Sequence, residues 1–538
     1  MDNKESFDLF EMSNSLIKKI INMIAEPLSH VFNCSIMSGV IPSQLKDAKV
    51  IPIYKLSKKS ETFKKIPANY RPISLLPIIS KLLEKVIGKQ LLDYLETNKI
   101  IHKHQYGFQP NKSTTHPMVH LLNEIGTAKN NKKISLGIFM DISRAFDCIS
   151  TPILLKKLEK IGIKNRELEW FKNYLTGRRQ CTLINEIKSG FLETKRGVPQ
   201  GGVLSPILFL IYINDLPLVT DMLTLLFADD SNFIIHGNSL DEIVPKVNLE
   251  MKKICDWFRK NELNIHPEKT KFMIFNKKEN SINWDDIIIN LNFNNGGEND
   301  QNLIKKLGYI NSESNIPAVK FLGIYIDNKL NFEYHIKYIQ KKISNSLFVI
   351  NRVKKLLNER SLKTLYTSLI QSHLEYGVII WSTCNSTSLQ PLIRMQKKAI
   401  RIISNAPYNS HTEKLFKKHN ILPINELAIY SKIMFMYDYL TNRLPNSFEG
   451  MWKKNNEILL NRRSQRNDNG NKFYIPVTNF KSIEKFPLYY YQKLWNDNCD
   501  NALLNIQLRK NRFKKTLKTF LFIDVQTVCT KINCPECS

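Results

Sequence analysis

The sequence lacks any long hydrophobic run. Its longest uninterrupted apolar stretch, Ile207 to Ile213, is about seven residues long, whereas a membrane-spanning helix needs about 20. Glycine and proline are also scarce, with 19 and 22 residues in a chain of 538, which excludes collagen-like and low-complexity fibres. The first residues mix both charges without an apolar segment, so we expect no signal peptide and no membrane partner.

Cysteine is sparse and irregular. The nine cysteines are scattered and odd in number, which is typical of reduced intracellular thiols rather than of a disulfide framework. Cys529, Cys534 and Cys537 near the C-terminus include one CxxC spacing but no clear histidine or fourth ligand. We therefore do not expect a zinc site.

Acidic residues are outnumbered by basic ones. The chain has 78 Lys and Arg against 49 Asp and Glu, a formal net charge of +29. Such an excess predicts a polyanionic partner, because basic side chains that bind phosphates release condensed counterions. No lysine-rich amphipathic segment lies beside a lipidation signal, which disfavours a membrane surface as that partner. With 43% hydrophobic residues, the chain has enough apolar material for several folded domains.

Three aspartates stand at the ends of apolar runs. Residues 134–142 form a nearly unbroken apolar run that reaches Asp141, as in a buried strand. Residues 223–236 are two apolar runs separated by Ala228, Asp229 and Asp230, which predicts a hairpin. Neither aspartate of the pair precedes glycine, so common turn chemistry does not explain them.

Acids on neighbouring strand ends repel one another unless a cation compensates them. Oxygen ligands suit Mg²⁺, and a pair of such ions can activate a hydroxyl and stabilise a leaving pyrophosphate. The alternative is that Asp141 and Asp147 are helix caps or surface acids and that the Asp229-Asp230 pair is an ordinary turn. Spacing alone does not decide between these interpretations.

Six motifs follow one another in the order of a known family. They are NYRPISLL at 69–76, FMDISRAFD at 139–147, GVPQGGVLSPILFLIYINDL at 197–216, FADD at 227–230, LNIHPEKTKFMIF at 263–275 and KFLGIYID at 320–327. In these motifs the chain resembles the reverse transcriptases of non-LTR retrotransposons, in particular the jockey-like group. The resemblance implies an α+β right-hand polymerase, with fingers, a palm built on an antiparallel sheet, a thumb, and a mostly helical C-terminal region.

The resemblance also implies a division of the chain. We expect an N-terminal extension and fingers at 1–130 and a palm at 131–330, the latter with a fingers segment and an Asn-rich insertion at about 277–318. Thumb-like helices would follow at 331–405, and a helical region with the cysteine-containing tail at 406–538.

The catalytic assignments come from the same resemblance. Asp141 and Asp229 match metal ligands, with Asp230 beside them and Ile142 included in the metal site, for two Mg²⁺ or Mn²⁺ ions. Lys269 matches a lysine that protonates or positions pyrophosphate, although Lys271 is only two residues away.

Five positions match the family's contacts to the incoming deoxynucleotide. Phe146 stands where a steric gate crowds a ribose 2′-hydroxyl, and Arg144 and Ala145 stand where the chain wraps the triphosphate. Arg71 matches a contact to triphosphate or template, and Gln200 a support of the template–nucleotide pair. The alternatives are a core role for Phe146 and a solvated cation at Arg71.

Other positions match contacts to nucleic acid. They are Lys55 in the fingers, Gly201 and Gly202, the primer-grip residues Phe321, Leu322 and Gly323, and Lys337 and Lys341 on a basic thumb helix at 332–357. That helix could instead present a charged solvent face. Gln109 departs from the family, which usually has arginine there, and Lys112 could supply the charge.

The sequence thus predicts an RNA-directed DNA polymerase that extends a DNA primer, or nicked target DNA, on an RNA template with dNTPs. No nuclease set of acids and histidine is visible, so we expect nicking to come from elsewhere. The resemblance implies action in the nucleus after a cytoplasmic ribonucleoprotein phase, although no clear targeting signal is present. The alternative function is a catalytically silent, repurposed nucleic-acid-binding protein. Template preference and oligomeric state stay open.

Overall fold

The computed structural model of the protein describes residues 7–55, 66–276, 282, 287–293, 303–306, 308–309, 318–458, 472–498 and 506–524. These residues form a mixed architecture of helices and sheets, as expected of an α+β chain. Within them, no helix is both long and apolar enough to cross a membrane. The cysteines of the C-terminal tail and most of the Asn-rich segment at 277–318 lie outside the described residues.

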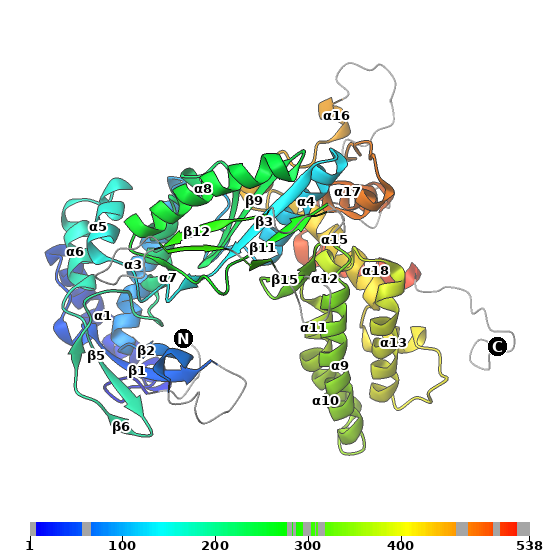
Figure 1. The fold of residues 1–538 in the computed structure, drawn as a ribbon. Coiled ribbons are helices and arrows are strands. Elements are labelled where there is room, and N and C mark those ends of the chain that lie inside the picture. The colour runs from blue at the N-terminus through cyan, green and yellow to red at the C-terminus, as the bar shows by residue number, and fades with distance from the viewer. Residues whose placement is uncertain are drawn as a thin grey trace.

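A five-stranded sheet occupies the centre of the molecule (Figure 1). Its strand order is β14 (Gly308–Tyr309), β11 (Lys271–Phe275), β3 (Ile134–Met140), β9 (Asp230–Gly237) and β8 (Leu223–Phe227). All neighbours are antiparallel except β14 and β11. The predicted strand at 134–142 and the hairpin at 223–236 are confirmed as β3 and as β8–β9.

Both faces of this sheet are covered, which is why β3 is buried throughout and apolar except for Ser135. One face, with Phe139 and Met273, joins a core that includes α4 (Thr115–Asn130). The other face, with Ile138 and Phe272, packs against α8 (Leu240–Lys260), α7 (Leu204–Ile213) and α5 (Thr151–Lys160). Because successive side chains of a strand point to opposite faces, the apolar run supplies both cores at once.

A second sheet belongs to an N-terminal lobe (Figure 1). Its order is β2 (Tyr70–Leu75), β1 (Asp47–Tyr54), β5 (Arg179–Ile184) and β6 (Ile187–Lys188), with β7 (Leu192–Glu193) also paired to β5. The helices of this lobe are α1 (Asn14–Ser38), α3 (Ile78–Thr97) and α6 (Asn165–Leu175). The sequence predicts a loop at residues 69–74 that opens into a helix; the helix is confirmed as α3, but the loop is wrong. Most of that segment forms the edge strand β2, where Pro72 is tolerated because an edge strand needs fewer N–H donors.

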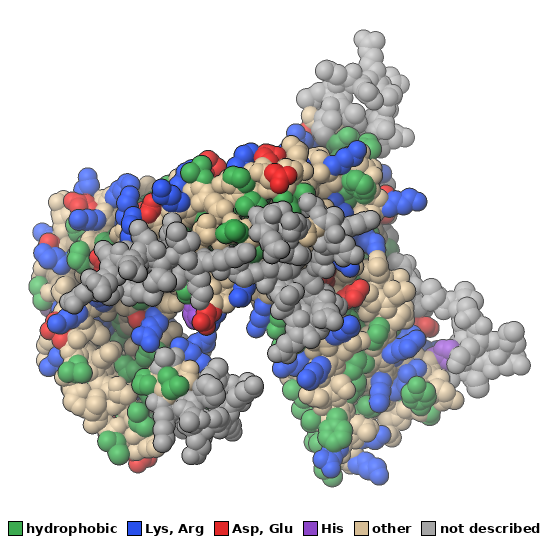
Figure 2. Space-filling view, in the orientation of Figure 1, with side chains coloured by type: hydrophobic (Ala, Val, Ile, Leu, Met, Phe, Trp, Pro, Cys, Tyr) green, Lys and Arg blue, Asp and Glu red, His purple; other side chains and the backbone are tan. Residues whose placement is uncertain are grey.

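A helical lobe follows the central sheet. It comprises α9 (Glu333–Val353), α10 (Glu359–Tyr366), α11 (Ser372–Glu375), α12 (Val378–Trp381), α13 (Ser386–Ile403), α14 (Glu413–His419), α15 (Ile424–Leu440), α16 (Asn455–Ile458), α17 (Pro487–Asn498) and α18 (Lys510–Asp524). Apolar residues of α9 at helical spacing, among them Ile336, Ile343 and Ile350, are buried in the core of this lobe. Figure 2 shows a hollow in the surface between this lobe and the N-terminal lobe, with basic side chains on both sides.

Two short sheets correct the predicted strand and loop assignments. Val319–Asp327, expected as one strand, is a hairpin of β15 (Ala318–Phe321) and β16 (Ile324–Asp327). It turns at Leu322 and Gly323, whose φ angles are 46° and 87°. The Asn-rich segment, expected as an insertion or long loop, contains among its described residues the pair β12 (Asn290–Phe293) and β13 (Leu303–Lys306). The remaining pair is β4 (Ile142–Ser143) with β10 (Asn264–Ile265).

Candidate active site

Sheet register brings the three predicted carboxylates to one end of the central sheet. Met140, the last residue of β3, pairs with Ser231 of β9, so Asp141 leaves the sheet where Asp230 enters it. Phe227 pairs with Asp230, which leaves Ala228 and Asp229 as a two-residue turn. Ala228 has a φ of 56°, a left-handed conformation that costs a residue with a Cβ some free energy.

The three acids interact electrostatically. Partial burial and the Asp141 carboxylate raise the pKa of Asp229 above its ordinary value. Burial, together with the charges of Asp229 and Asp141, raises the pKa of Asp230 to about 6. Carboxylates held together in this way repel one another, and the cations near them compensate that repulsion only in part, since the pKa values of Asp229 and Asp230 stay raised.

The donor chemistry therefore fits a divalent cation with oxygen ligands. Within the described part of the chain, however, no three acidic, histidine or cysteine side chains already converge as a metal-holding group. Ile142 has a hydrocarbon side chain, so only its backbone carbonyl could contribute to such a site.

Lys269 reaches Asp141 through a second strand pairing. Strand β10 pairs with β4, directly after Asp141, and the His266 N–H donates to the Asp141 carbonyl at 2.9 Å. The following turn carries Lys269, whose Nζ lies 2.9 Å from Asp141 Oδ2. The ammonium group of Lys269 thus pairs with one member of the acidic group.

Three further predicted cations, Lys55, Arg71 and Arg144, lie near one another. Burial first, and then the neighbouring charges of Arg71, Lys269 and Arg144, lower the pKa of Lys55. Arg71 belongs to edge strand β2, opposite Ile53, and its charge acts to lower the pKa of Asp229. These groups bring the N-terminal lobe to the acidic end of the central sheet.

Phe146 lies in an aromatic contact near this site. Its ring centroid is 5.2 Å from that of Phe209 and 6.2 Å from that of Phe108. The side chain is half-buried, whereas neighbouring Ala145 is buried. Packing therefore holds the ring in place while part of it stays accessible.

The PQGG segment is fixed against strand β2. The Ser74 N–H donates to the Gln200 carbonyl at 2.8 Å. Gly201 has a φ of 136°, and a Cβ there would lie 2.5 Å from the Ser74 carbonyl oxygen, so only glycine fits. A Cβ at Gly202 would come within 2.8 Å of Ser205 Oγ.

The hairpin β15–β16 lies next to the acids. The Phe321 ring meets Phe139 edge-on at 6.0 Å, and the Tyr376 hydroxyl donates to the Leu322 carbonyl at 2.5 Å. The charge of Lys320 acts to lower the pKa of Asp230. Sequence reasoning missed Lys320, although its place directly before Phe321 was the available signal.

Lys337 and Lys341 are not brought to this cluster. Both are exposed on α9, in the helical lobe on the other side of the hollow (Figures 1 and 2). Among the described residues, no hydrogen bond or ion pair joins either of them to the acidic group.

Gln105 is a second residue that sequence reasoning missed. Its side chain is fully buried, and its Oε1 accepts from the N–H groups of Gly107 at 2.9 Å and Ala228 at 3.2 Å. The flanking backbone pairs with β8, because Leu226 donates to His104 and Tyr106 donates to Leu226. Nothing in the local pattern of HQYGF predicts this contact with the turn that carries Asp229.

These features are those expected of the reverse transcriptase class of proteins. The family described as reverse transcriptase (RNA-dependent DNA polymerase) matches residues 56–326. The chain belongs to this family.

The similar proteins are polymerases of non-LTR mobile elements. The chain is 27% identical over 412 residues to the RNA-directed DNA polymerase from mobile element jockey of Drosophila melanogaster, covering 74% of this chain and 42% of that protein. It is 25% identical over 447 residues to the probable RNA-directed DNA polymerase from transposon BS of the same organism, covering 79% and 45%. The chain thus spans less than half the length of these curated relatives.

Among solved structures, the apo telomerase of Candida tropicalis is 13% identical and aligns with a TM-score of 0.37, over 81% of this chain and 73% of that chain. The family assignment rests on the sequence match.

Proposed function

We propose that this chain is an RNA-directed DNA polymerase that extends a DNA 3′-end on an RNA template with dNTPs. The observation that carries the proposal is the meeting of Asp141, Asp229 and Asp230 at one sheet end, within the segment that matches the family. The cations that surround these acids suit a triphosphate. The names of the relatives support a mobile-element role and, with it, action in the nucleus.

In this proposal the N-terminal lobe is the fingers, the central sheet with α4 and α8 is the palm, and α9 to α13 form the thumb. The template–primer duplex would occupy the hollow between the lobes (Figure 2). Lys337 and Lys341 would contact its phosphates, which position a duplex without reading its sequence. Phe321, Leu322 and Gly323 would hold the primer end beside Asp230.

Asp141, Asp229 and Asp230, with the Ile142 carbonyl, would hold two Mg²⁺ or Mn²⁺ ions. The chemistry that such ions supply when bound is activation of the 3′-hydroxyl and neutralisation of the leaving pyrophosphate. Lys269 Nζ, already 2.9 Å from Asp141 Oδ2, would position or protonate the pyrophosphate. Lys55, Arg71 and Arg144 would bind the triphosphate, and the Phe146 ring would crowd a 2′-hydroxyl.

The PQGG segment and strand β2 would form one wall of the nucleotide site. Gln200 would support the template–nucleotide pair, because its backbone is fixed to Ser74. Gly201 and Gly202 leave room for a nucleic-acid strand to approach the backbone. Ala145, which is buried, would hold the neighbouring Arg144 and Phe146 in place.

Primer extension tests the proposal. Purified protein, poly(rA) with an oligo(dT) primer and labelled dTTP should give incorporation that requires a divalent metal. Asp229→Asn should reduce incorporation by at least a thousandfold and leave template–primer binding nearly unchanged. Asp221→Asn is a matched control, because that carboxylate lies just before β8 and its side chain is 95% exposed. Binding by the wild type without incorporation would favour the catalytically silent nucleic-acid-binding protein instead.

A further inference from the structure

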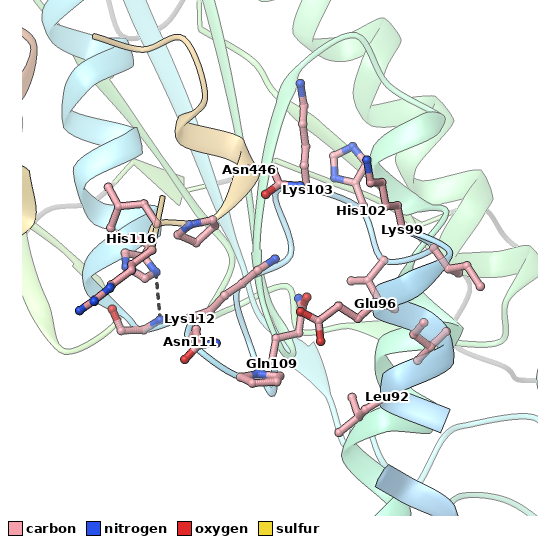
Figure 3. Close-up of a pocket in the computed structure, with 18 of the residues that line it drawn as sticks. Leu92, Glu96, Lys99, His102, Lys103, Gln109, Asn111, Lys112, His116 and Asn446 are labelled. Atoms are coloured by element: carbon pink, nitrogen blue, oxygen red, sulfur yellow. Dashed lines mark hydrogen bonds between the residues drawn. The ribbon is translucent and has the colours of Figure 1, made fainter. Parts of the chain in front are cut away.

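A large cavity lies between the C-terminal end of α3 and the helical lobe. Its volume is about 1200 Å³, and it is lined by the C-terminal end of α3, the segment 99–103, the segment 109–113, the end of α15 and Lys510 of α18. Figure 3 shows Lys99, His102 and Lys103 on one wall, and Lys112 and His116 on the other. None of the proposed catalytic or nucleotide-binding residues lines it.

The lining is strongly basic. Five cations (Lys99, Lys103, Lys112, Arg443 and Lys510) face two acids (Glu96 and Asp438), so 5 − 2 leaves +3. Lys510 pairs with Asp438 at 2.7 Å. Among the ion pairs of the described residues, none involves Lys99 or Lys103, and both are exposed. The charge of this wall is therefore available to an anionic ligand.

The rest of the lining suits nucleic-acid bases better than a lone anion. Asn111, Asn442 and Asn446 present amide groups that can both donate and accept hydrogen bonds. Burial lowers the pKa of His116 to about 4, so its ring is neutral near pH 7. Cations for phosphates, with amides and neutral rings for unstacked bases, are typical of proteins that bind single strands.

A single residue, Gln105, connects the cavity to the candidate active site. Lys112 Nζ and Gln109 Nε2, both in the lining, donate to the Gln105 carbonyl at 2.7 and 2.6 Å. The Gln105 side chain in turn accepts from the Ala228 N–H of the turn before Asp229. A ligand that contacts Lys112 is thus connected through Gln105 to the turn that carries Asp229.

We propose that this cavity is a second nucleic-acid site, which binds a short single-stranded segment through its phosphates. The volume exceeds what one phosphate needs, and the open side lets a strand enter and leave. Binding here does not require polymerisation, so the inference goes beyond the proposed function.

Fluorescence anisotropy with a labelled 12-mer of uridylate tests this site. Unlabelled blunt RNA–DNA duplex is added at saturation so that the hollow between the lobes is filled. Lys99→Glu combined with Lys103→Glu should weaken single-strand binding roughly tenfold, because it reverses two charges of the lining. The matched control is Lys85→Glu with Lys89→Glu, two exposed lysines earlier on α3 that do not line the cavity.

An equal loss in the control pair, or no loss in the cavity pair, would overturn the proposal. So would displacement of the 12-mer by the blunt duplex, since it would mean that the cavity is not a separate single-strand site. Binding of a labelled duplex is measured separately. A failure of that measurement would count against the proposed function and not against the cavity.

Discussion

Phe146 shows how one side chain could select a sugar. The ring is held between Phe209 and Phe108 and is half-buried, so it cannot move aside without losing aromatic contact. A stiff ring can exclude a ribose with its 2′-hydroxyl by volume, whereas a smaller side chain cannot.

Phe146→Ala should therefore raise the kcat/KM for UTP relative to dTTP by at least tenfold, measured by single-nucleotide extension. Phe108→Ala removes one of the two rings that hold Phe146, so a smaller rise in the same ratio is expected for that variant. An unchanged ratio in the Phe146 variant would leave that ring with a packing role only.

Lys432 is a buried cation outside the site. Its side chain is 3% exposed and lies over the Tyr490 ring at 4.8 Å. Burial lowers its pKa to about 7, with a small opposing effect of Cys384. Between about pH 7 and the ordinary lysine pKa of about 10.4, the unfolded chain binds a proton that the folded chain does not, so stability contributed by this group rises with pH.

Lys432→Met should consequently be more stable than the wild type at pH 7, by an amount of a few kcal/mol. The difference should shrink as pH rises toward 10. Thermal unfolding of both proteins between pH 6 and 9.5 measures it. A difference that does not change with pH would show that Lys432 is charged in the folded state.

At the level of elements, the contact between PQGG and strand β2 joins the N-terminal lobe to the candidate site. A buried carboxylate supports this contact from behind, because Glu84 accepts from the Val203 N–H at 2.5 Å and from the Tyr174 hydroxyl at 2.8 Å. The start of α7 and the glycines before it are thus held by side chains from α3 and α6.

Gly201→Ala should lower the extension rate by at least tenfold, because the new Cβ would meet the Ser74 carbonyl at 2.5 Å in a left-handed conformation. The KM for dTTP should rise as Gln200 shifts. Gly190→Ala is the matched control, since a Cβ there meets nothing within 4 Å. Equal activity of the two variants would contradict the close approach.

At the level of the whole molecule, the net charge of +29 and the basic sides of the hollow predict salt-sensitive binding. Two interpretations of α9 can be separated on this basis. If its lysines contact phosphates, they contribute to the salt dependence of affinity; if they only face solvent, they do not.

Lys337→Ala with Lys341→Ala should reduce the slope of log affinity against log salt by about 2 for a template–primer duplex. Lys156→Ala with Lys160→Ala on α5 is the control, because these lysines are also exposed and four residues apart. The slope is measured by titration between about 50 and 300 mM KCl. If both variants kept the wild-type slope, α9 would present a solvent face.

The local pattern of the sequence determined the main strands and the chemistry of the site. An apolar run that ends in Asp141, and two apolar runs around Asp229 and Asp230, predicted β3 and the β8–β9 hairpin. These features are local, because strand period and turns depend on neighbouring residues. The family motifs identified the same acids and the cations around them.

Tertiary structure alone decided which distant groups meet. Lys269 reaches Asp141 only because β10 pairs with β4, and Gln105 supports the Ala228 turn only because its segment runs beside β8. Most of NYRPISLL forms a strand because it pairs with β1 at the edge of the second sheet. The cavity forms because α3, α15 and α18 pack around the segment 109–113. Such contacts depend on register and packing between segments far apart in the chain, which periodicity does not encode.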